Sequence, residues 1–277
     1  MCKRDLIIGL LIGTSALFLA GKAVAIERVT WVGARESGLS QAMAAVPGPF
    51  SVFNNQAFLT ENTIPIVAIS YRQPYFIPGY HECALSVVYP TNAAVFALGI
   101  TQASIDAYKE STIGISIAKK LTARLSAGVL FNYFTLNFPE SGSRKGCSIF
   151  DGGVSYKCSE SLSVGLIVKN MVWSRIETFQ YNLSFPLVIR GGASLYLTER
   201  ILLATEGLFE QGFGTGIHLG TEVKLTENFT VRGGISTNPF QHSFGFGYEW
   251  RICQLDFAMV HHELLGYSPV ISFSFRL

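Results

Sequence analysis

Apolar and polar residues alternate along most of the chain, in runs of roughly ten residues. The C-terminal run is the most regular, and its apolar side is formed by Ile271, Phe273, Phe275 and Leu277. Its other side is formed by Ser272, Ser274 and Arg276. A period of two residues places alternate side chains on opposite faces of an extended strand. The pattern therefore predicts a protein built of β-strands up to its last residue.

Short polar turns such as "LTER" (197–200) and "LTEN" (225–228) alternate with longer connections such as "FPESGSRKGC" along the chain. This alternation predicts a meander of antiparallel hairpins. We expect about fourteen strands, near 64–72, 82–89, 93–102, 110–119, 122–136, 147–157, 161–172, 186–197, 201–210, 214–225, 229–237, 241–250, 252–263 and 267–277. An even number of strands closes without exposed edges. The expected fold is an all-β, up-and-down antiparallel β-barrel.

Alternation alone does not say which face meets the solvent. Only 14% of the residues are charged and 49% are hydrophobic, whereas soluble domains carry about 25% charged residues. After Ala25 no run of 18 apolar residues occurs that would form a membrane-spanning helix. We therefore expect the apolar face of the barrel to contact lipid and the polar face to line the lumen.

The N-terminus has the features of a secretory signal peptide. Lys3 and Arg4 precede an apolar run, and Ala23 and Ala25 supply small residues before the expected cleavage site after Ala25. An uncleaved anchor is the alternative. Cleavage after Ala25 removes three of the 21 basic residues and one of the 19 acidic residues. The mature chain then has equal numbers of both and no net charge. We expect export to the outer membrane of a Gram-negative cell, contact with the barrel assembly machinery and outer-membrane lipid, and no nucleic-acid partner.

We divide the chain into a signal peptide (1–25), an N-terminal plug segment (26–62) and a transmembrane barrel (63–277). Residues 33–62 do not alternate and contain a short small-residue stretch typical of a helix, "SQAMAA". A disordered leader is the alternative to a plug. The aromatic residues Phe50, Phe53 and Phe58 indicate that the segment packs against the lumen or caps its periplasmic end.

Charged residues of both signs recur on the face expected to line the lumen: Asp151, Lys169, Arg190, Glu206, Glu222, Arg232, Glu249, Asp256 and Arg276. Arg190 and Glu206 lie on neighbouring expected strands, as do Glu222 and Arg232. Charges inside a barrel are tolerable when they are paired. A network that fills the lumen and sets the strand register is one interpretation. An ion or proton path, or a constriction that binds polar solutes, is the other.

Catalytic and metal sites are not expected. His261, His262 and Glu263 are consecutive, and neighbouring residues on a strand point to opposite faces, so they form no simple metal site. No nucleotide-binding or nucleophile motif occurs. The four cysteines after Ala25 show no metal-binding spacing, and we expect unpaired thiols rather than a bridge between Cys83 and Cys147. We therefore expect no enzyme and no cofactor.

Several motifs resemble the PorV/PorQ family, within the FadL-like superfamily of 14-stranded outer-membrane barrels. "GARESGLSQAMAA" followed by "NNQAFL" is similar to the family's N-terminal leader, in which Arg35 and Asn55 match motif positions. Gln56 stands where the family has proline. "LDFAMVHHELLGYSPVISFSFRL" (255–277) resembles the closing hairpin, and its end resembles the C-terminal assembly signal of outer-membrane barrels, with residues Ile271, Phe273, Phe275 and Leu277.

Two functions remain open at this stage. The PorV/PorQ resemblance implies a docking partner in type IX secretion or surface attachment, which would contact secretion components or secreted cargo. The wider FadL-like resemblance implies a passage for small hydrophobic ligands, lined by Phe50, Phe53 and Phe58. The sequence is closer to the first family, so docking is the expected function and passage the alternative.

Overall fold

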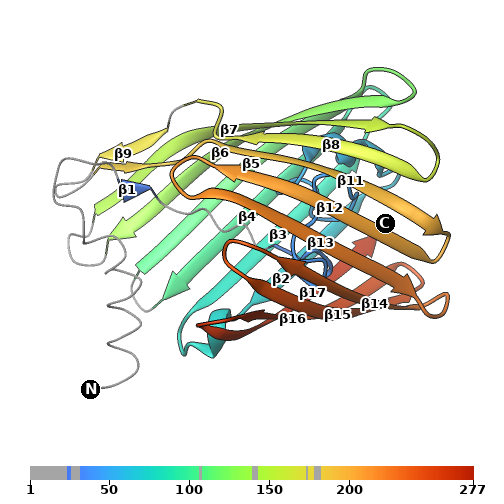
Figure 1. Ribbon diagram of the computed structural model, residues 1–277. Helices are drawn as coiled ribbons and strands as arrows, with labels where there is room; N and C mark the ends of the chain where they lie inside the picture. Colours follow the sequence, from blue (N-terminus) through green and yellow to red (C-terminus); the bar gives the residue numbers. More distant parts are fainter. Residues whose placement is uncertain (1–23, 26–31, 106–107, 139–142, 173, 178–181) are drawn as a thin grey trace.

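The computed structural model describes residues 24–25, 32–105, 108–138, 143–172, 174–177 and 182–277. Fourteen antiparallel strands form one closed barrel (Figure 1). They are β2 (Ile66–Arg72), β3 (His81–Pro90), β4 (Val95–Ile105), β5 (Tyr108–Lys120), β6 (Leu125–Phe138), β7 (Ser143–Lys157), β8 (Leu162–Lys169), β11 (Val188–Thr198), β12 (Ile201–Glu210), β13 (Gly214–Lys224), β14 (Phe229–Ser236), β15 (Gln241–Trp250), β16 (Cys253–His262) and β17 (Gly266–Arg276). The predicted all-β barrel of fourteen strands is confirmed.

The first and last strands of the barrel form its seam. Strand β17 pairs with β2 from Val270 opposite Arg72 to Arg276 opposite Ile66. The backbone N–H of Leu277 adds a bond to the carbonyl oxygen of Pro65 at 2.9 Å. This pairing satisfies the backbone groups that an open sheet would leave exposed at two edges. The regular C-terminal alternation therefore belongs to a strand with a neighbour on each side.

The two ends of the barrel differ. At one end six tight turns join successive strands, and we call it the short-turn end; the C-terminus lies there (Figure 1). The opposite end, the long-loop end, carries a small sheet of β1 (Val24–Ala25), β9 (Arg175–Glu177) and β10 (Asn182–Ser184), which the sequence did not predict. Val24 and Ala25 fall in the expected signal peptide, whose residues 1–23 lie outside the described part of the chain.

Strand β8 is shorter than predicted. It ends at Lys169 rather than near residue 172, because Asn170 has a positive φ of 56° that ends the extended conformation. Its long neighbour β7 pairs with it only from Gly152 to Lys157. Beyond that point the backbone of Met171 bonds to Phe150, and the described residues of the segment that follows β8 pack against β7.

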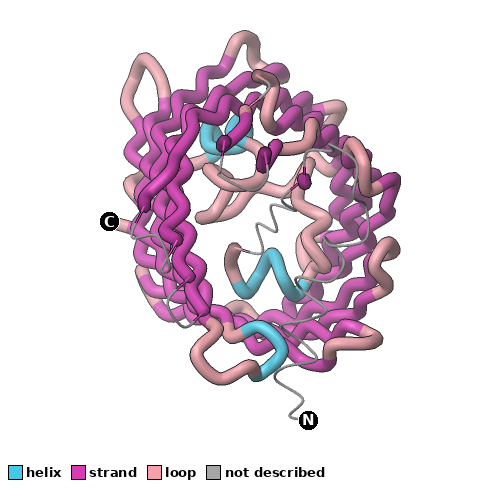
Figure 2. Tube along the Cα trace, turned by 90° about the vertical axis from the view of Figure 1, so that its left-hand side faces the viewer, coloured by secondary structure: helices cyan, strands magenta, loops and turns pink. Residues whose placement is uncertain are grey.

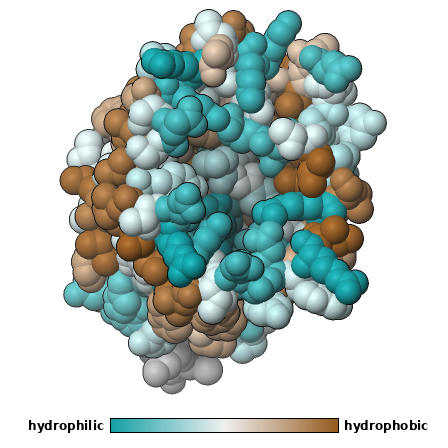
Figure 3. All heavy atoms as spheres, turned by 90° about the vertical axis from the view of Figure 1, so that its right-hand side faces the viewer, coloured by the Kyte–Doolittle hydropathy of each residue, from teal (hydrophilic) through white to brown (hydrophobic). Residues whose placement is uncertain are grey.

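The inward and outward faces of the strands have the expected chemistry. Large apolar side chains are exposed on the outer surface, among them Ile115, Phe131, Phe244 and Ile271. The inward positions are rich in small polar residues, including buried serines Ser70, Ser86, Ser116, Ser194, Ser243, Ser272 and Ser274. At the short-turn end, hydrophilic side chains crowd the rim while hydrophobic ones lie on the flanks (Figure 3). In the described part of the chain, no helix has the length and apolar character needed to cross a membrane.

The N-terminal segment lies inside the barrel. It contains α2 (Ala34–Gly38) and the 3-10 helix η1 (Gln56–Glu61), and Figure 2 shows helical segments enclosed by the ring of strands. A third helical turn, η2 (Pro74–Phe76), belongs to the loop after β2. Almost every residue from Val32 to Thr60 is buried. We call residues 32–62 the plug.

In the described part of the chain, the cysteines Cys83, Cys147, Cys158 and Cys253 form no disulfide. Cys83 is exposed on the outer face of β3, whereas Cys147 packs against the inward residues Phe134 and Ile149, so the two thiols lie on opposite sides of the barrel wall.

Deletion of Phe273–Leu277 tests the seam. The truncation removes most of the pairing between β17 and β2, so we expect the barrel not to close and not to insert into membranes. The measurement is the heat-modifiable electrophoretic mobility of folded barrels in isolated outer membranes. Phe275→Leu keeps the backbone and an apolar outward side chain, and it should assemble normally. Normal assembly of the truncated chain would show that the seam is not needed.

Candidate functional site: the plugged lumen

The plug begins with a turn that only glycine allows. Gly33 has a φ of 90°, and a Cβ atom there would lie 2.0 Å from Oε2 of Glu36. The backbone N–H of Gly33 donates to Oγ of Ser70 at 3.2 Å, and that of Ala34 donates to Oγ of Ser272 at 3.1 Å. Inward serines of the seam strands thus bind the N-terminal backbone groups of α2.

Arg35 connects the plug to the charged wall of the lumen. Its Nε and Nη2 donate to the two carboxylate oxygens of Glu222 on β13, at 2.8 and 3.1 Å. Its Nη1 donates to the carbonyl oxygen of Pro47, also in the plug, at 2.6 Å. A guanidinium that binds both oxygens of a carboxylate has a defined orientation. Arg35 therefore holds two parts of the plug against one strand.

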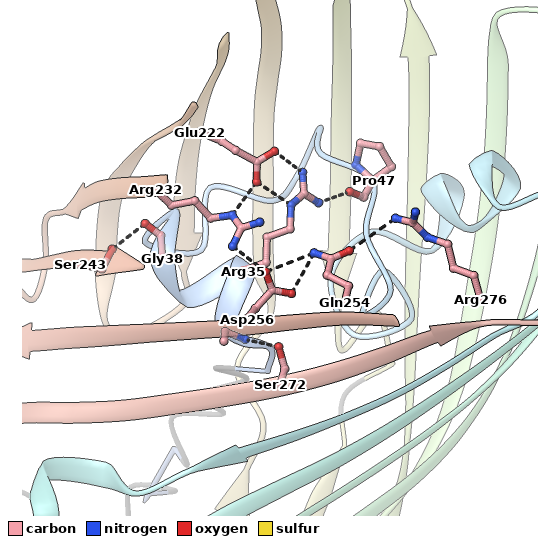
Figure 4. A network of polar contacts seen from close by, with 11 residues as sticks. Arg35, Gly38, Pro47, Glu222, Arg232, Ser243, Gln254, Asp256, Ser272 and Arg276 are labelled. Carbon is pink, nitrogen blue, oxygen red and sulfur yellow. Dashed lines mark hydrogen bonds and ion pairs between the residues drawn. The ribbon is translucent and has the colours of Figure 1, made fainter. Parts of the chain in front are cut away.

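Glu222 is shared between the plug and the wall (Figure 4). Its Oε2 also accepts from Nε of Arg232 on β14 at 2.6 Å, and Arg232 Nη1 donates to Oδ1 of Asp256 on β16 at 2.7 Å. Gln254 donates to both oxygens of Asp256 and accepts from Nη2 of Arg276. Arg276 lies at the short-turn end of the lumen and also pairs with Glu249. Arg232 and Asp256 are almost fully buried, whereas Arg276 is exposed.

A second ion pair holds the middle of the plug. Arg190 on β11 and Glu206 on β12 are both buried, and Nη2 of Arg190 donates to Oε2 of Glu206 at 3.0 Å. The same oxygen accepts from the backbone N–H groups of Met43 and Ala44, at 3.0 and 2.7 Å. Arg190 also donates to the carbonyl oxygen of Gln41 at 2.7 Å. The pair thus binds both donors and acceptors of the plug backbone.

Sequence reasoning missed several residues of this polar wall. Ser243 donates to the carbonyl oxygen of Gly38 at 3.1 Å, and Ser194 donates to that of Ala45 at 2.8 Å. Nδ1 of His218 lies 2.6 Å from the carbonyl oxygen of Ser40. The signal in the sequence was the excess of inward serines, because a hydroxyl can bind either type of backbone group.

The second half of the plug meets an apolar wall. Phe50 and Phe53 stack with ring centroids 6.4 Å apart, and with Val32, Val52 and Leu59 they form the plug side of a buried cluster. Its wall side consists of Ile66, Ala68, Val88, Val95, Ala97, Ala118 and Leu130 on β2 to β6. Phe58 is also buried. Phe50 and Phe53 therefore pack the plug against the barrel wall.

Asn55, which the family resemblance singled out, orders the end of the plug. Its Oδ1 accepts from the N–H of Ala57 and caps η1, while Nδ2 donates to the carbonyl oxygens of Ala44 and Val154. Nζ of Lys169 donates to the carbonyl oxygen of Phe53 at 2.9 Å. Gly165 permits this close packing, since a Cβ atom there would lie 1.8 Å from the carbonyl oxygen of Ala44.

An apolar cluster lies inside the long-loop end of the barrel. Phe134 and Leu136 on β6, Ile149 on β7, Ile176 on β9 and Phe185 are all buried in it. The rings of Phe134 and Phe185 meet edge to face, with centroids 5.0 Å apart. We call these five residues the mouth cluster. Below it, Asp151 accepts from Nδ2 of Asn132 and from the N–H of Asn170 at 3.0 and 2.8 Å.

The histidines near the β16–β17 turn have separate environments. His261 packs against His242 and Tyr267 across adjacent strands, with ring centroids 4.6 and 4.5 Å away. His262 instead accepts from the N–H groups of Leu264 and Leu265 through Nδ1. Among the described residues no group of three or more histidine, cysteine or acidic side chains is placed to hold a metal.

These features define a closed fourteen-stranded barrel with an N-terminal plug, and several solved structures share its fold. CymD, a monoaromatic hydrocarbon channel, matches with a TM-score of 0.65 and 15% identity over 93% of this chain and 99% of that one. A Pseudomonas aeruginosa FadL homologue matches with a TM-score of 0.65 and 14% identity over 92% and 99%. The Pseudomonas putida toluene transporter TodX matches with a TM-score of 0.66 and 12% identity over 87% and 98%.

At these identities the likeness establishes the fold. Residues 66–277 make up about three quarters of the chain, so a match over 93% of the chain includes part of the N-terminal segment. The shared architecture is thus the fourteen-stranded barrel together with material N-terminal to its first strand. No protein-family description matches the chain. No curated protein matches it either.

Substitution of Glu206 tests the ion pair that binds the plug. Glu206→Ala leaves Arg190 buried without its carboxylate and leaves two plug N–H groups without their acceptor. We expect the free energy of unfolding in detergent to fall by about 3–5 kcal/mol, measured by urea titration.

The exposed pair of Arg276 and Glu249 provides the control. Glu249→Ala should lower the free energy of unfolding by at most about 1 kcal/mol. Equal losses for Glu206→Ala and Glu249→Ala would contradict a role of Glu206 in holding the plug.

Proposed function

We propose that the protein is an outer-membrane channel for small hydrophobic molecules. The single observation that carries the proposal is the mouth cluster, a buried apolar surface inside the long-loop end that is separate from the apolar wall behind the plug. Lumens that conduct hydrophilic solutes are polar and filled with water. An apolar surface at the mouth instead favours a solute that gains free energy on leaving water.

The mouth cluster has the chemistry of a site for a small aromatic or aliphatic molecule. Two of its five members are phenylalanines that already pack edge to face, and rings prefer this geometry with other rings. Ile176 and Phe185 come from the segment after β8, not from the barrel strands of β6 and β7. A ligand that displaces this segment can cover Phe134, Leu136 and Ile149 in its place, so these strand residues stay out of water.

The comparisons support the same proposal. CymD is a monoaromatic hydrocarbon channel and TodX a toluene transporter, and both share the fold of this chain. A barrel with this fold and a lipid-compatible outer surface belongs in an outer membrane, so we propose that location, with lipid and the barrel assembly machinery as partners. The signal peptide expected at residues 1–25 would direct the export.

Docking in type IX secretion, which the sequence analysis favoured, is the second candidate. The observation in its favour is that the plug and the ion pairs of Arg190, Glu206, Glu222 and Arg232 occupy the lumen. The similar structures reported above are channels or FadL relatives, and none of their titles names a secretion component. The comparisons therefore favour a channel for hydrophobic molecules over a docking protein.

Uptake of a radiolabelled monoaromatic hydrocarbon by cells that express the protein tests passage. Ile149→Asn places an amide in the mouth cluster, and we expect initial uptake at low concentration to fall about tenfold, because the ligand loses an apolar contact surface. Ser148→Asn puts the same amide on the opposite face of β7 and should leave uptake unchanged. Wild-type uptake no greater than that of cells without the protein would overturn the proposal.

Affinity purification of the tagged protein from native outer membranes tests docking. If passage is the function, we expect the barrel to be recovered without stoichiometric secretion components. Stable recovery of such components, retained after a high-salt wash, would instead establish the docking function. A tagged unrelated barrel from the same membranes is the control for carry-over.

A further inference from the structure

One acidic residue of the plug has no role in the contacts described so far. Glu36, in the short helix α2, is fully buried, with 0% of its surface exposed. Neither of its carboxylate oxygens has a hydrogen-bond partner among the residues that the structure describes. Its neighbour Arg35 points to Glu222 and Pro47 instead. A carboxylate in such surroundings is unfavourable in its charged form.

The space around the carboxyl group is closely fitted to it. A Cβ atom on Gly33 would lie 2.0 Å from Oε2 of Glu36 and 2.7 Å from the ring of Phe50. On the other side, a Cβ atom on Gly48 would lie 3.1 Å from Oε1. Glu36 is therefore held between two glycines and an aromatic ring, all belonging to the plug, and away from bulk water.

The charges around Glu36 balance only when it is neutral. Helix α2 packs against β14, β15, β16 and β17. The charged side chains that these strands direct to the lumen are Arg232 and Asp256 and, at the short-turn end, Glu249 and Arg276, which pair with each other. Arg35 and Arg232 are matched by Glu222 and Asp256. An ionised Glu36 is a fifth charge without a counterion.

Burial raises the pKa of Glu36 to about 7. Arg35, the backbone N–H of Glu36 itself and Arg232 act in the opposite direction, and the nearby charge of Asp256 adds to the increase. The raised pKa and the geometry agree, because both follow from the loss of water around an acid that has no partner.

We propose that Glu36 is a proton-binding site that couples the docking of the plug to pH, so that the docked plug carries a proton and ionisation of Glu36 favours its release. When α2 leaves its place in the lumen, Glu36 meets water and its pKa returns to the ordinary value of 4.5. The docked state therefore binds the proton more tightly. Docking is strongest below the ordinary pKa and weakens as the pH rises towards the pKa of the docked state.

The size of the effect follows from the two pKa values. Between the undocked pKa and the docked pKa, the docked plug holds one more proton, so the docking equilibrium changes by up to about tenfold per pH unit. The consequence for passage, an easier opening at higher pH, rests on the proposed function. The docking equilibrium itself does not, and it can be measured without any transported molecule.

Hydrogen–deuterium exchange of the plug in the purified protein provides the test. After correction for intrinsic rates, we expect the opening equilibrium of residues 34–46 to rise roughly 10- to 100-fold between about pH 5 and about pH 8. Glu36→Gln is neutral at every pH, so its plug should stay protected at the low-pH level. Glu227→Gln removes an exposed carboxylate from the β13–β14 turn and should follow the wild type.

An unchanged plug protection across this pH range in the wild type would overturn the proposal, and so would the same pH dependence in Glu36→Gln. If Glu36→Gln does not fold, infrared titration of the wild type decides. A carbonyl band of a buried, protonated carboxylic acid that disappears with a midpoint near the docked pKa supports the proposal, and absence of the band at about pH 5 overturns it. Normal pH-dependent docking of the plug, with no hydrocarbon uptake by cells, would refute the proposed channel function and leave the role of Glu36 intact.

Discussion

A closed sheet of fourteen strands leaves no edge, but it encloses a lumen that its own inward side chains do not fill. The rest of the structure depends on this constraint. The pairing of β17 with β2 satisfies the backbone groups of both strands. The enclosed volume then has to be occupied by water or by chain. In this protein the plug occupies much of it, and the peptide groups of the plug in turn need partners on the wall.

The wall supplies those partners unevenly, and this division gives the plug two halves. From β11 to β17, ion pairs and serines bind the backbone of residues 33–45. From β2 to β6, apolar side chains pack against Phe50, Phe53 and Leu59. The first half thus has most of the polar contacts, which water can replace, beside a smaller apolar cluster of Leu39 and Met43 with Leu202. The second half is held mainly by burial of apolar surface, which water cannot replace.

Much of the barrel was predictable because strand alternation is a local property. The period of two and the turns placed most strand boundaries within a few residues, and opposite charges on neighbouring strands pointed to the pairs of Arg190 with Glu206 and Glu222 with Arg232. Among the larger differences, β7 begins at Ser143 rather than near residue 147, and a single backbone conformation at Asn170 ends β8 early. Alternation carries no information about such a φ angle, nor about the β9–β10 hairpin, whose strands are three residues long.

The site was less predictable, because it is formed between segments that are distant in sequence. Nothing near Arg35 indicates that its partner is Glu222, which is 187 residues away. The inward charges were read as a network within the wall, whereas Glu206 and Glu222 also bind the plug. Glu36 was not singled out, although its neighbour Arg35 was, because its isolation depends on the burial created by Gly33, Gly48 and Phe50.

The polar half of the plug is also incompletely bonded, and this bears on how it moves. Besides Glu36, buried polar atoms of Ser37 and Gln41 have no hydrogen-bond partner in the described part of the chain. Each gains a hydrogen bond when water reaches it, so release of residues 33–45 recovers free energy that offsets part of the lost contacts. The aromatic half has fewer such atoms, Oδ1 of Asn54 and Oε1 of Gln56 against five atoms in residues 33–45, and it is also held by the buried rings of Phe50 and Phe53. A motion that opens the lumen should therefore begin at α2 and pivot on the cluster around Phe50 and Phe53, rather than expel the whole plug.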